Sequence, residues 1–218
     1  MTRHLKRHAV PKSWPVPRKG TTFVVRPSSN TESGLPVLII LRDLLKLAQN
    51  RKEVKKAINS KEVLLNGRPI KEDKNSAVLF DVINVVPSKK NYKIVLKENG
   101  KFGVEEISEK DAGKKVSKIV DKKILKGKKI QLNLGDGRNV IYDKDCKVND
   151  SVLMNMENKK VEKILPLKEK SSIIVFAGKH AGKSGEIENL NAERKMASVK
   201  GKDGEKINVL IKQLMVVD

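Results

Sequence analysis

The segment AGKHAGKS (177–184) has residue types that could bind a nucleotide phosphate. It matches the relaxed P-loop pattern, with alanine where glycine normally comes first. A P-loop needs a helix that begins at the Lys-Ser pair, because the amides of its first turn hold the phosphates. Here a glycine follows that pair, and the next residues alternate with the period of a strand. The pattern therefore predicts a glycine-bearing hairpin loop whose amides, together with Lys179, His180 and Lys183, face nucleic-acid phosphates.

A second group of cations lies in the stretch NRKEVKKAINSKEVLLNGRPI. A helix over its first half has one apolar face and places Lys52, Lys55 and Lys56 on an outward face. The Asn-Gly dipeptide that follows is typical of a tight hairpin turn with positive φ. The alternative is an ordinary helix whose charged face is merely solvated. Such helices usually mix positive and negative residues. Here a single acidic residue lies among the basic residues between Arg51 and Lys61, which favours a binding face.

Motifs for catalysis and metal binding are missing from the sequence. It contains no HExxH, no GxSxG and no pair of carboxylates in an apolar run. Its one cysteine, Cys146, excludes an intramolecular disulfide and a cysteine-based metal cage, and is expected to be a small core residue. His4 and His8 lack a nearby carboxylate or thiol, so we expect them to contact phosphate. We therefore expect no enzyme activity, metal, cofactor or small-molecule substrate.

The charge of the whole chain indicates a polyanionic partner. Lys and Arg total 47 against 26 Asp and Glu, which gives a net charge of +21 and favours nucleic acid or an anionic membrane surface. No apolar run approaches the ~18 residues of a membrane span, and the N-terminus lacks the apolar core of a secretory signal. Seven of nine arginines lie at or before Arg68, so the closest contacts are expected in the N-terminal third. These features predict a cytoplasmic, soluble protein that binds a polyanion.

Four domains are expected to carry these residues, in an α+β fold. Residues 1–35 are basic, rich in proline and without periodicity, which predicts an extended arm. Residues 36–88 predict two helices and a β-hairpin, a small RNA-binding module. Residues 89–170 contain three hairpin patterns and predict a small β-barrel-like domain, in which lysines alternate with acids and serve mainly solubility. Residues 171–218 predict a further series of short strands.

Several elements are specific enough to be tested. A helix is expected from Pro36 to about residue 49, ahead of the basic helix. A strand is expected over residues 77–86, a hairpin over 92–107 and a short helix over 108–116. Trp14, in the arm, would either stack on RNA bases or pin the arm to its own domain, because tryptophan serves both purposes.

Three pieces of the sequence together resemble one known family. NRKEVKKAINSKEVLLNGRPI resembles the RNA-binding motif named after bacterial small-subunit ribosomal protein four, and FAGKHAGKSGEI is similar to a KOW motif. HLKRHAVPKSWPV, followed by RPS and LPVLIILRDLLK, resembles the start of the eukaryotic- and archaeal-type small-subunit ribosomal protein four family. The resemblance covers essentially the whole chain and implies the family's order of arm, motif, central β domain and C-terminal SH3-like β-barrel. The short C-terminus favours an archaeal member.

The resemblance implies a non-catalytic constituent of the small ribosomal subunit. Its expected partners are folded small-subunit rRNA and neighbouring small-subunit ribosomal proteins, with no membrane. The expected RNA-binding residues are Arg3, Lys6, Arg7, Trp14, Arg18, Lys19, Arg42, Lys46, Arg51, Lys52, Lys55, Lys56, Lys61, Arg68, Lys179, His180 and Lys183. Lysine replaces arginine at several motif positions, which favours contact with phosphate over forked recognition of bases.

Two other functions use the same motifs. An RNA-modifying enzyme such as a pseudouridine synthase would need a catalytic domain with a nucleophilic aspartate, for which 218 residues leave no room beside these modules. A transcription-elongation adaptor would use the KOW domain against polymerase, and would purify with polymerase instead of ribosomal subunits.

Overall fold

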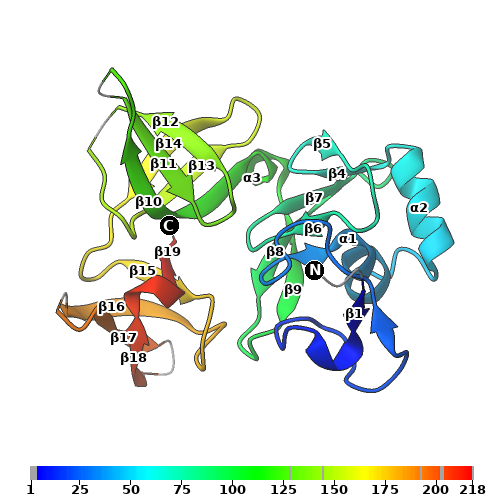
Figure 1. Ribbon diagram of the computed structural model, residues 1–218, viewed down its shortest axis with the longest axis horizontal. Helices are drawn as coiled ribbons and strands as arrows, with labels where there is room; N and C mark the ends of the chain where they lie inside the picture. Colours follow the sequence, from blue (N-terminus) through cyan, green and yellow to red (C-terminus); the bar gives the residue numbers. More distant parts are fainter. Residues whose placement is uncertain (1–3, 128, 144, 192, 202–203, 218) are drawn as a thin grey trace. The chain divides into compact units, whose positions relative to one another are not determined.

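The chain divides into two units of mainly antiparallel β structure in the computed structural model (Figure 1). The structure describes residues 4–127, 129–143, 145–191, 193–201 and 204–217. The first unit comprises Met1–Lys97 and Lys101–Gly113, and the second comprises Glu98–Gly100 and Lys114–Asp218. No helix in the described part of the chain is long and apolar enough to cross a bilayer.

The first unit is built on one five-stranded sheet. Its elements are β1 (Leu5–Lys6), the 3-10 helix η1 (Arg7–Ala9), β2 (Phe23–Val24), β3 (Leu35–Pro36), α1 (Val37–Ile39), the π-helix η2 (Ile40–Leu44), α2 (Arg51–Asn59), β4 (Val63–Leu65), β5 (Arg68–Pro69), β6 (Ser76–Ala77), β7 (Val82–Val85), β8 (Lys90–Leu96), β9 (Phe102–Ile107) and α3 (Glu109–Ala112). The sheet has the order β5-β4-β7-β8-β9. The strands contribute Val63, Ile83 and Ile94 to the core, and the first helical segment contributes Ile39 and Ile40. The helix α2 packs against η2 and lies at the outer edge of this unit (Figure 1).

The hairpin expected over residues 92–107 forms as β8 and β9, but in the first unit. Ile83 of β7 pairs with Tyr92 of β8, so the hairpin extends the sheet that begins with β4 and β5. It therefore does not open the central domain, where we expected it, and the proposed boundary at residue 88 falls inside a sheet. Local patterns predict a hairpin, but not the strand beside which it lies.

The helices are shorter than predicted. The first helical segment ends at Leu44 in a π turn, and Lys46, with φ +55°, then turns the chain away. The strand expected over residues 77–86 is broken at Phe80, whose φ is +64°, and the helix expected over 108–116 is the single turn α3. The β-rich, multidomain organisation agrees with the prediction, whereas the helical content is smaller than an α+β label implies.

The N-terminal arm is folded back on itself where we expected an extended segment. Strands β1 and β2 pair and close the loop between them. The Arg7 guanidinium lies inside that loop: Nε donates to the Thr21 carbonyl (2.6 Å), and the two terminal nitrogens donate to the Pro17 carbonyl (2.7 Å) and Thr21 Oγ1 (2.8 Å). Because one side chain satisfies several loop acceptors, the loop is ordered by the protein itself.

Trp14 anchors the arm to the first unit. Its side chain is 2% exposed, and the carbonyl of the preceding Ser13 accepts the Phe102 amide of β9 (2.7 Å). Of the two roles considered, stacking on RNA bases and packing on the protein, the burial supports packing. The indole Nε1 of Trp14 has no hydrogen-bond partner among the residues described here, so the side chain is held by apolar contact.

The second unit contains two five-stranded antiparallel sheets. Its elements are β10 (Lys114–Ile124), β11 (Ile130–Leu134), β12 (Asn139–Tyr142), β13 (Ser151–Asn155), β14 (Lys160–Leu165), β15 (Ser172–Val175), β16 (Ser184–Asn191), β17 (Met196–Gly201), β18 (Lys206–Leu210), the 3-10 helix η3 (Ile211–Gln213) and β19 (Leu214–Val216). The strand orders are β12-β11-β10-β13-β14 and β18-β17-β16-β15-β19. The hairpins β11–β12 and β13–β14 are the ones predicted, and Cys146 lies in the core that the first sheet encloses.

A buried lysine joins the two sheets of this unit. Lys118 of β10 is 6% exposed, and its Nζ donates to the carbonyls of Ile211 and, at 2.9 Å, Leu214. Ser151 of β13 makes a second link between the sheets, because its Oγ accepts the Val216 amide of β19 (3.0 Å). Burial lowers the pKa of Lys118 to about 8.

The stability of the second unit should therefore rise between pH 8 and 10.5. Below pH 8 Lys118 is charged in both states, and the folded state carries the full cost of burying the ammonium. Between its folded pKa of about 8 and its ordinary value of 10.5, the unfolded state binds the extra proton, so the free energy of unfolding increases with pH. We expect a rise on the order of 1–3 kcal/mol in urea titrations followed by circular dichroism. The Lys118→Met variant should lack that rise, and identical pH profiles for this variant and the unmodified protein would contradict the account.

Candidate nucleic-acid interface

The basic face of α2 is held rigidly by the helix's own cap and core contacts. Asn50 begins the helix, and its Oδ1 accepts the amides of Lys52 (2.9 Å) and Glu53 (3.1 Å). Val54 and Ile58 are buried on the inner face. The outward face carries the exposed side chains of Lys52, Lys55 and Lys56, none of which has an ion-pair partner among the described residues. The prediction of this helix and its orientation is confirmed.

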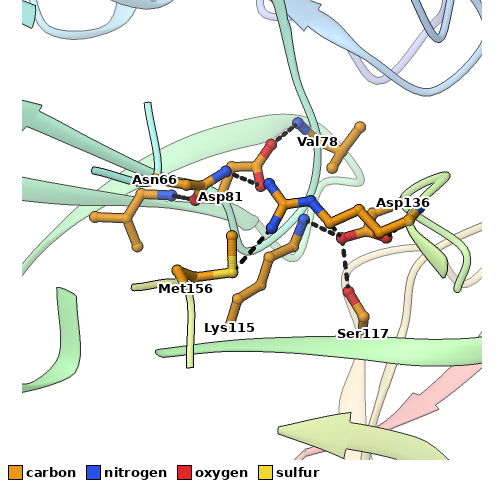
Figure 2. Close-up of polar contacts among 9 residues, drawn as sticks. Asn66, Val78, Asp81, Lys115, Ser117, Asp136 and Met156 are labelled. Carbon is orange, nitrogen blue, oxygen red and sulfur yellow. Dashed lines mark hydrogen bonds and ion pairs between the residues drawn. The ribbon is translucent and has the colours of Figure 1, made fainter. Parts of the chain in front are cut away.

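The Asn-Gly turn after α2 is held by a buried polar network, which Figure 2 shows. Asn66 and Gly67 both have positive φ, 52° and 75°, as the dipeptide predicted. Asn66 is 6% exposed; its Nδ2 donates to Asp81 Oδ1 (2.8 Å) and its Oδ1 accepts the Val82 amide (3.0 Å). Asp81 Oδ2 in turn accepts the Val78 amide (2.7 Å). The carboxamide thus fixes the hairpin to β7, a role that the turn pattern alone did not reveal.

Three of the predicted arginines make structural contacts within the protein. Arg7 binds the carbonyls of its own loop. Arg42 makes a two-pronged ion pair with Asp43, at 2.8 and 2.9 Å, and the hydrogen bonds that the guanidinium donates to Asp43 raise its pKa. Arg51 Nε donates to the buried carboxylate of Asp73 (2.5 Å). Donors engaged in this way are not available to RNA, although the Arg51 side chain is still 47% exposed.

The loop between β15 and β16 is less open to phosphate than its sequence suggests. The amides of Ala181, Gly182 and Lys183 donate to carbonyls of the same loop or of β15. Lys183 Nζ forms an ion pair with Glu205 (2.7 Å), and this hydrogen bond lowers the pKa of Glu205. Lys179 is exposed and His180 half-buried, so these two side chains remain as candidate contacts. As predicted, a strand and not a helix follows the loop.

The glycine near the start of this strand has a structural explanation. A Cβ at Gly185 would lie 2.1 Å from the Lys200 carbonyl oxygen of the neighbouring strand. The glycine therefore permits β16 and β17 to approach closely, and a phosphate is not needed to account for it.

The remaining predicted residues lie on the surface. Lys61 follows α2 closely and Arg68 begins β5, so both belong to the helix–hairpin segment. Exposed side chains are those of Lys6, Arg18, Lys19, Lys46, Lys61 and Arg68. Arg3 lies outside the described residues. The structure thus brings the α2 row, Lys61 and Arg68 into one local segment of the first unit, while Lys179 and His180 belong to the second unit.

A buried ion pair in the second unit supports the fold of its first sheet. Lys115 Nζ lies 2.8 Å from Asp136 Oδ2, which also accepts the Ser117 hydroxyl at 3.1 Å (Figure 2). Burial alone would raise the pKa of Asp136, but Lys115 and Arg138 together outweigh burial and lower the pKa. These contacts hold the β11–β12 turn. Among the described residues, no group of three or more His, Cys, Asp or Glu is arranged to hold a metal ion.

Comparison with known proteins identifies relatives along most of the chain. The ribosomal family S4e matches residues 88–161, and the RS4NT domain matches residues 1–29. Small ribosomal subunit protein eS4 of Methanocella arvoryzae is 37% identical over 197 residues, 89% of this chain and 83% of that protein. The eS4 protein of Methanococcus maripaludis strain C5 is 36% identical over 230 aligned residues, covering 99% of this chain and 93% of that protein.

A solved structure shows the same fold. The crystal structure of 30S ribosomal protein S4e from Thermoplasma acidophilum covers 85% of this chain and 95% of its own, with a TM-score of 0.74 at 24% sequence identity. The sequence relatives are ribosomal proteins of the small subunit, in agreement with the expected non-catalytic role. On the identity and coverage of these relatives, the chain belongs to the family of small ribosomal subunit protein eS4.

Proposed function

We propose that this protein is a structural constituent of the small subunit of the cytoplasmic ribosome and binds folded small-subunit rRNA. The observation that carries the proposal is the row Lys52, Lys55 and Lys56 on α2, whose ammonium groups face solvent on a helix fixed by its cap and core. Ammonium groups without carboxylate partners suit phosphate, because each contact releases a counterion from the RNA.

The rigidity of the helix–hairpin segment favours recognition of a preformed RNA surface. The Asn66–Asp81 network and the buried face of α2 hold the cations in place before any partner binds. Side chains cannot read the deep major groove of A-form RNA, so shape and phosphate positions provide the recognition. Lysine at these positions agrees with that mode, since an ammonium is a point charge and not a planar fork.

Other parts of the chain would extend the contact. Lys6, Arg18 and Lys19 are exposed cations of the folded arm, and Lys179 with His180 are those of the β15–β16 loop. The sheet β18-β17-β16-β15-β19 would be the SH3-like barrel of the KOW domain, and the sheet β12-β11-β10-β13-β14 the central domain. The arm, the helix–hairpin module, these two domains and neighbouring ribosomal proteins complete the proposed assembly.

Replacing Lys52, Lys55 and Lys56 together with glutamine should flatten the salt dependence of rRNA binding. Each lost phosphate contact lowers the slope of log K against log salt concentration by roughly 0.7–0.9, so we expect a decrease of about 2. Filter binding of a small-subunit rRNA transcript across a salt series measures this slope.

A matched control replaces three other exposed lysines, Lys159, Lys160 and Lys170 of the second unit, with glutamine. It has the same net charge as the α2 variant but alters a region where lysines alternate with acids. Equal slopes for the α2 variant and the unmodified protein would remove α2 from the interface. Equal decreases in both variants would show that net charge, and not the α2 face, determines binding.

A further inference from the structure

The tip of the hairpin β10–β11 is described except for residue 128, and it has an unusual composition. Ile124 and Ile130 form the last strand pair, and the Leu125 amide then donates to the Lys129 carbonyl (2.8 Å) to close the turn. Gly127, with φ +80°, supplies the left-handed residue that the turn requires. The Leu125–Lys129 hydrogen bond thus closes the turn between the two strands.

The tip is a concentrated source of positive charge. Between Asp121 and Ile130 the sequence is KKILKGKK, with five lysines and no acidic residue. Lys122, the first of these, is occupied within the protein: its Nζ donates to the Cys146 carbonyl (3.1 Å) and lies 3.6 Å from Asp145. The lysines at 123, 126 and 129 are exposed and have no ion-pair partner in the part of the chain that is described.

An apolar side chain lies among these lysines. Ile124 is 73% exposed, the largest exposed fraction among the large hydrophobic side chains described. Two other lysines of β10 have acidic partners: Lys114 Nζ lies 3.6 Å from Glu162, and Lys115 Nζ lies 2.8 Å from Asp136. A solvated surface would need neither the run of cations nor the isoleucine, so the combination indicates that the tip is covered by a partner.

We infer that the β10–β11 tip, with the exposed side chains of Lys123, Ile124, Lys126 and Lys129, is an additional RNA-binding element of this protein. Its lysines contact phosphates while Ile124 packs against the sugar edges of a shallow A-form minor groove. RNA fits better than a protein neighbour, because the charge of the tip is of one sign and RNA offers phosphates at regular spacing. The inference rests on the proposed function for the identity of the RNA, and adds a contact from a domain whose lysines the sequence pattern assigned mainly to solubility.

Two variants separate the ionic and apolar parts of this contact. A triple variant should lower the slope of log K against log salt concentration by about 2 for a small-subunit rRNA transcript; its substitutions are Lys123→Gln, Lys126→Gln and Lys129→Gln. Ile124→Ser should lower affinity about tenfold at fixed salt and leave the slope unchanged, because the lost contact releases no counterion. Both changes alter exposed side chains, and circular dichroism melting verifies that the fold is retained.

The α2 variant and the Lys159, Lys160 and Lys170 control described above make the result specific. A slope lowered by the tip variant but not by the control supports the inference. An unchanged slope for the tip variant, with a lowered slope for the α2 variant, overturns the inference and leaves the proposed function in place. Failure of the unmodified protein to bind the transcript overturns the proposed function. Normal binding to the transcript with reduced incorporation into small subunits assigns the tip to a protein neighbour and overturns the inference.

Discussion

Trp14→Ala is expected to lower the free energy of unfolding of the first unit by about 3–5 kcal/mol, the usual cost of truncating a large buried aromatic residue. Trp14 is 2% exposed and belongs to the arm, so the alanine variant would leave a cavity and release the arm from the unit. Urea denaturation followed by circular dichroism measures the loss, and limited proteolysis should then cleave the arm first.

Trp14→Phe provides the matched control. The indole Nε1 has no hydrogen-bond partner among the described residues, so phenylalanine removes a buried polar group while keeping most of the apolar contact. We expect Trp14→Phe to lower the free energy of unfolding by less than half as much as Trp14→Ala does. If Trp14 instead served by stacking on RNA, Trp14→Ala would weaken rRNA binding while the denaturation midpoint stayed the same, and that result would contradict the packing role.

Asn66→Asp is expected to destabilise the first unit by an amount on the order of 3 kcal/mol, because it replaces a hydrogen-bond donor with a second buried carboxylate beside Asp81, and like charges repel and are costly to bury. The substitution removes the Nδ2 donor and places a second carboxylate 2.8 Å from Asp81 Oδ1, in a site where residue 66 is 6% exposed. The denaturation midpoint in urea at neutral pH measures the effect.

Exchanging the two side chains tests the geometry of the network. In the double variant Asn66→Asp with Asp81→Asn, the new carboxylate can still accept the Val82 amide. The new carboxamide can accept the Val78 amide and donate across the pair, so each hydrogen bond has a counterpart. We expect the double variant to recover most of the stability lost in Asn66→Asp. If the double variant instead loses as much stability as the two single variants combined, the contact between these side chains is not what fixes the hairpin.

The parts of the fold that depend on neighbouring residues were predictable from sequence. The helix from Arg51, with Val54 and Ile58 inward, follows from apolar spacing, and the turn at Asn66 follows from the dipeptide. Both are determined within about ten residues of chain. The strand after the β15–β16 loop was predictable for the same reason, because period-2 alternation excludes the helix of a P-loop.

The contacts that the sequence did not reveal are those between residues distant along the chain. Arg7 and Arg51 were expected to bind RNA, yet donors of both are engaged within the protein, by the loop carbonyls around Thr21 and by Asp73. Composition identified the arm as basic but not as closed, because the closure depends on Arg7 and on the burial of Trp14. A charge pattern gives the number of cations, whereas their availability depends on tertiary contacts that the pattern does not contain.

The pairing of β7 with β8 determines at which residues the chain can be cut without disrupting a sheet. The match to the ribosomal family S4e begins at residue 88, yet β8 and β9 complete a sheet whose other strands precede that residue. Cleavage at 88 would leave Val82–Val85 as an open edge with unsatisfied amides and carbonyls, a template for intermolecular association. The segment that matches the family and the compact unit of the chain are therefore different stretches of sequence, and we expect insertions or truncations near residue 113 to disturb the sheet less than those near residue 88.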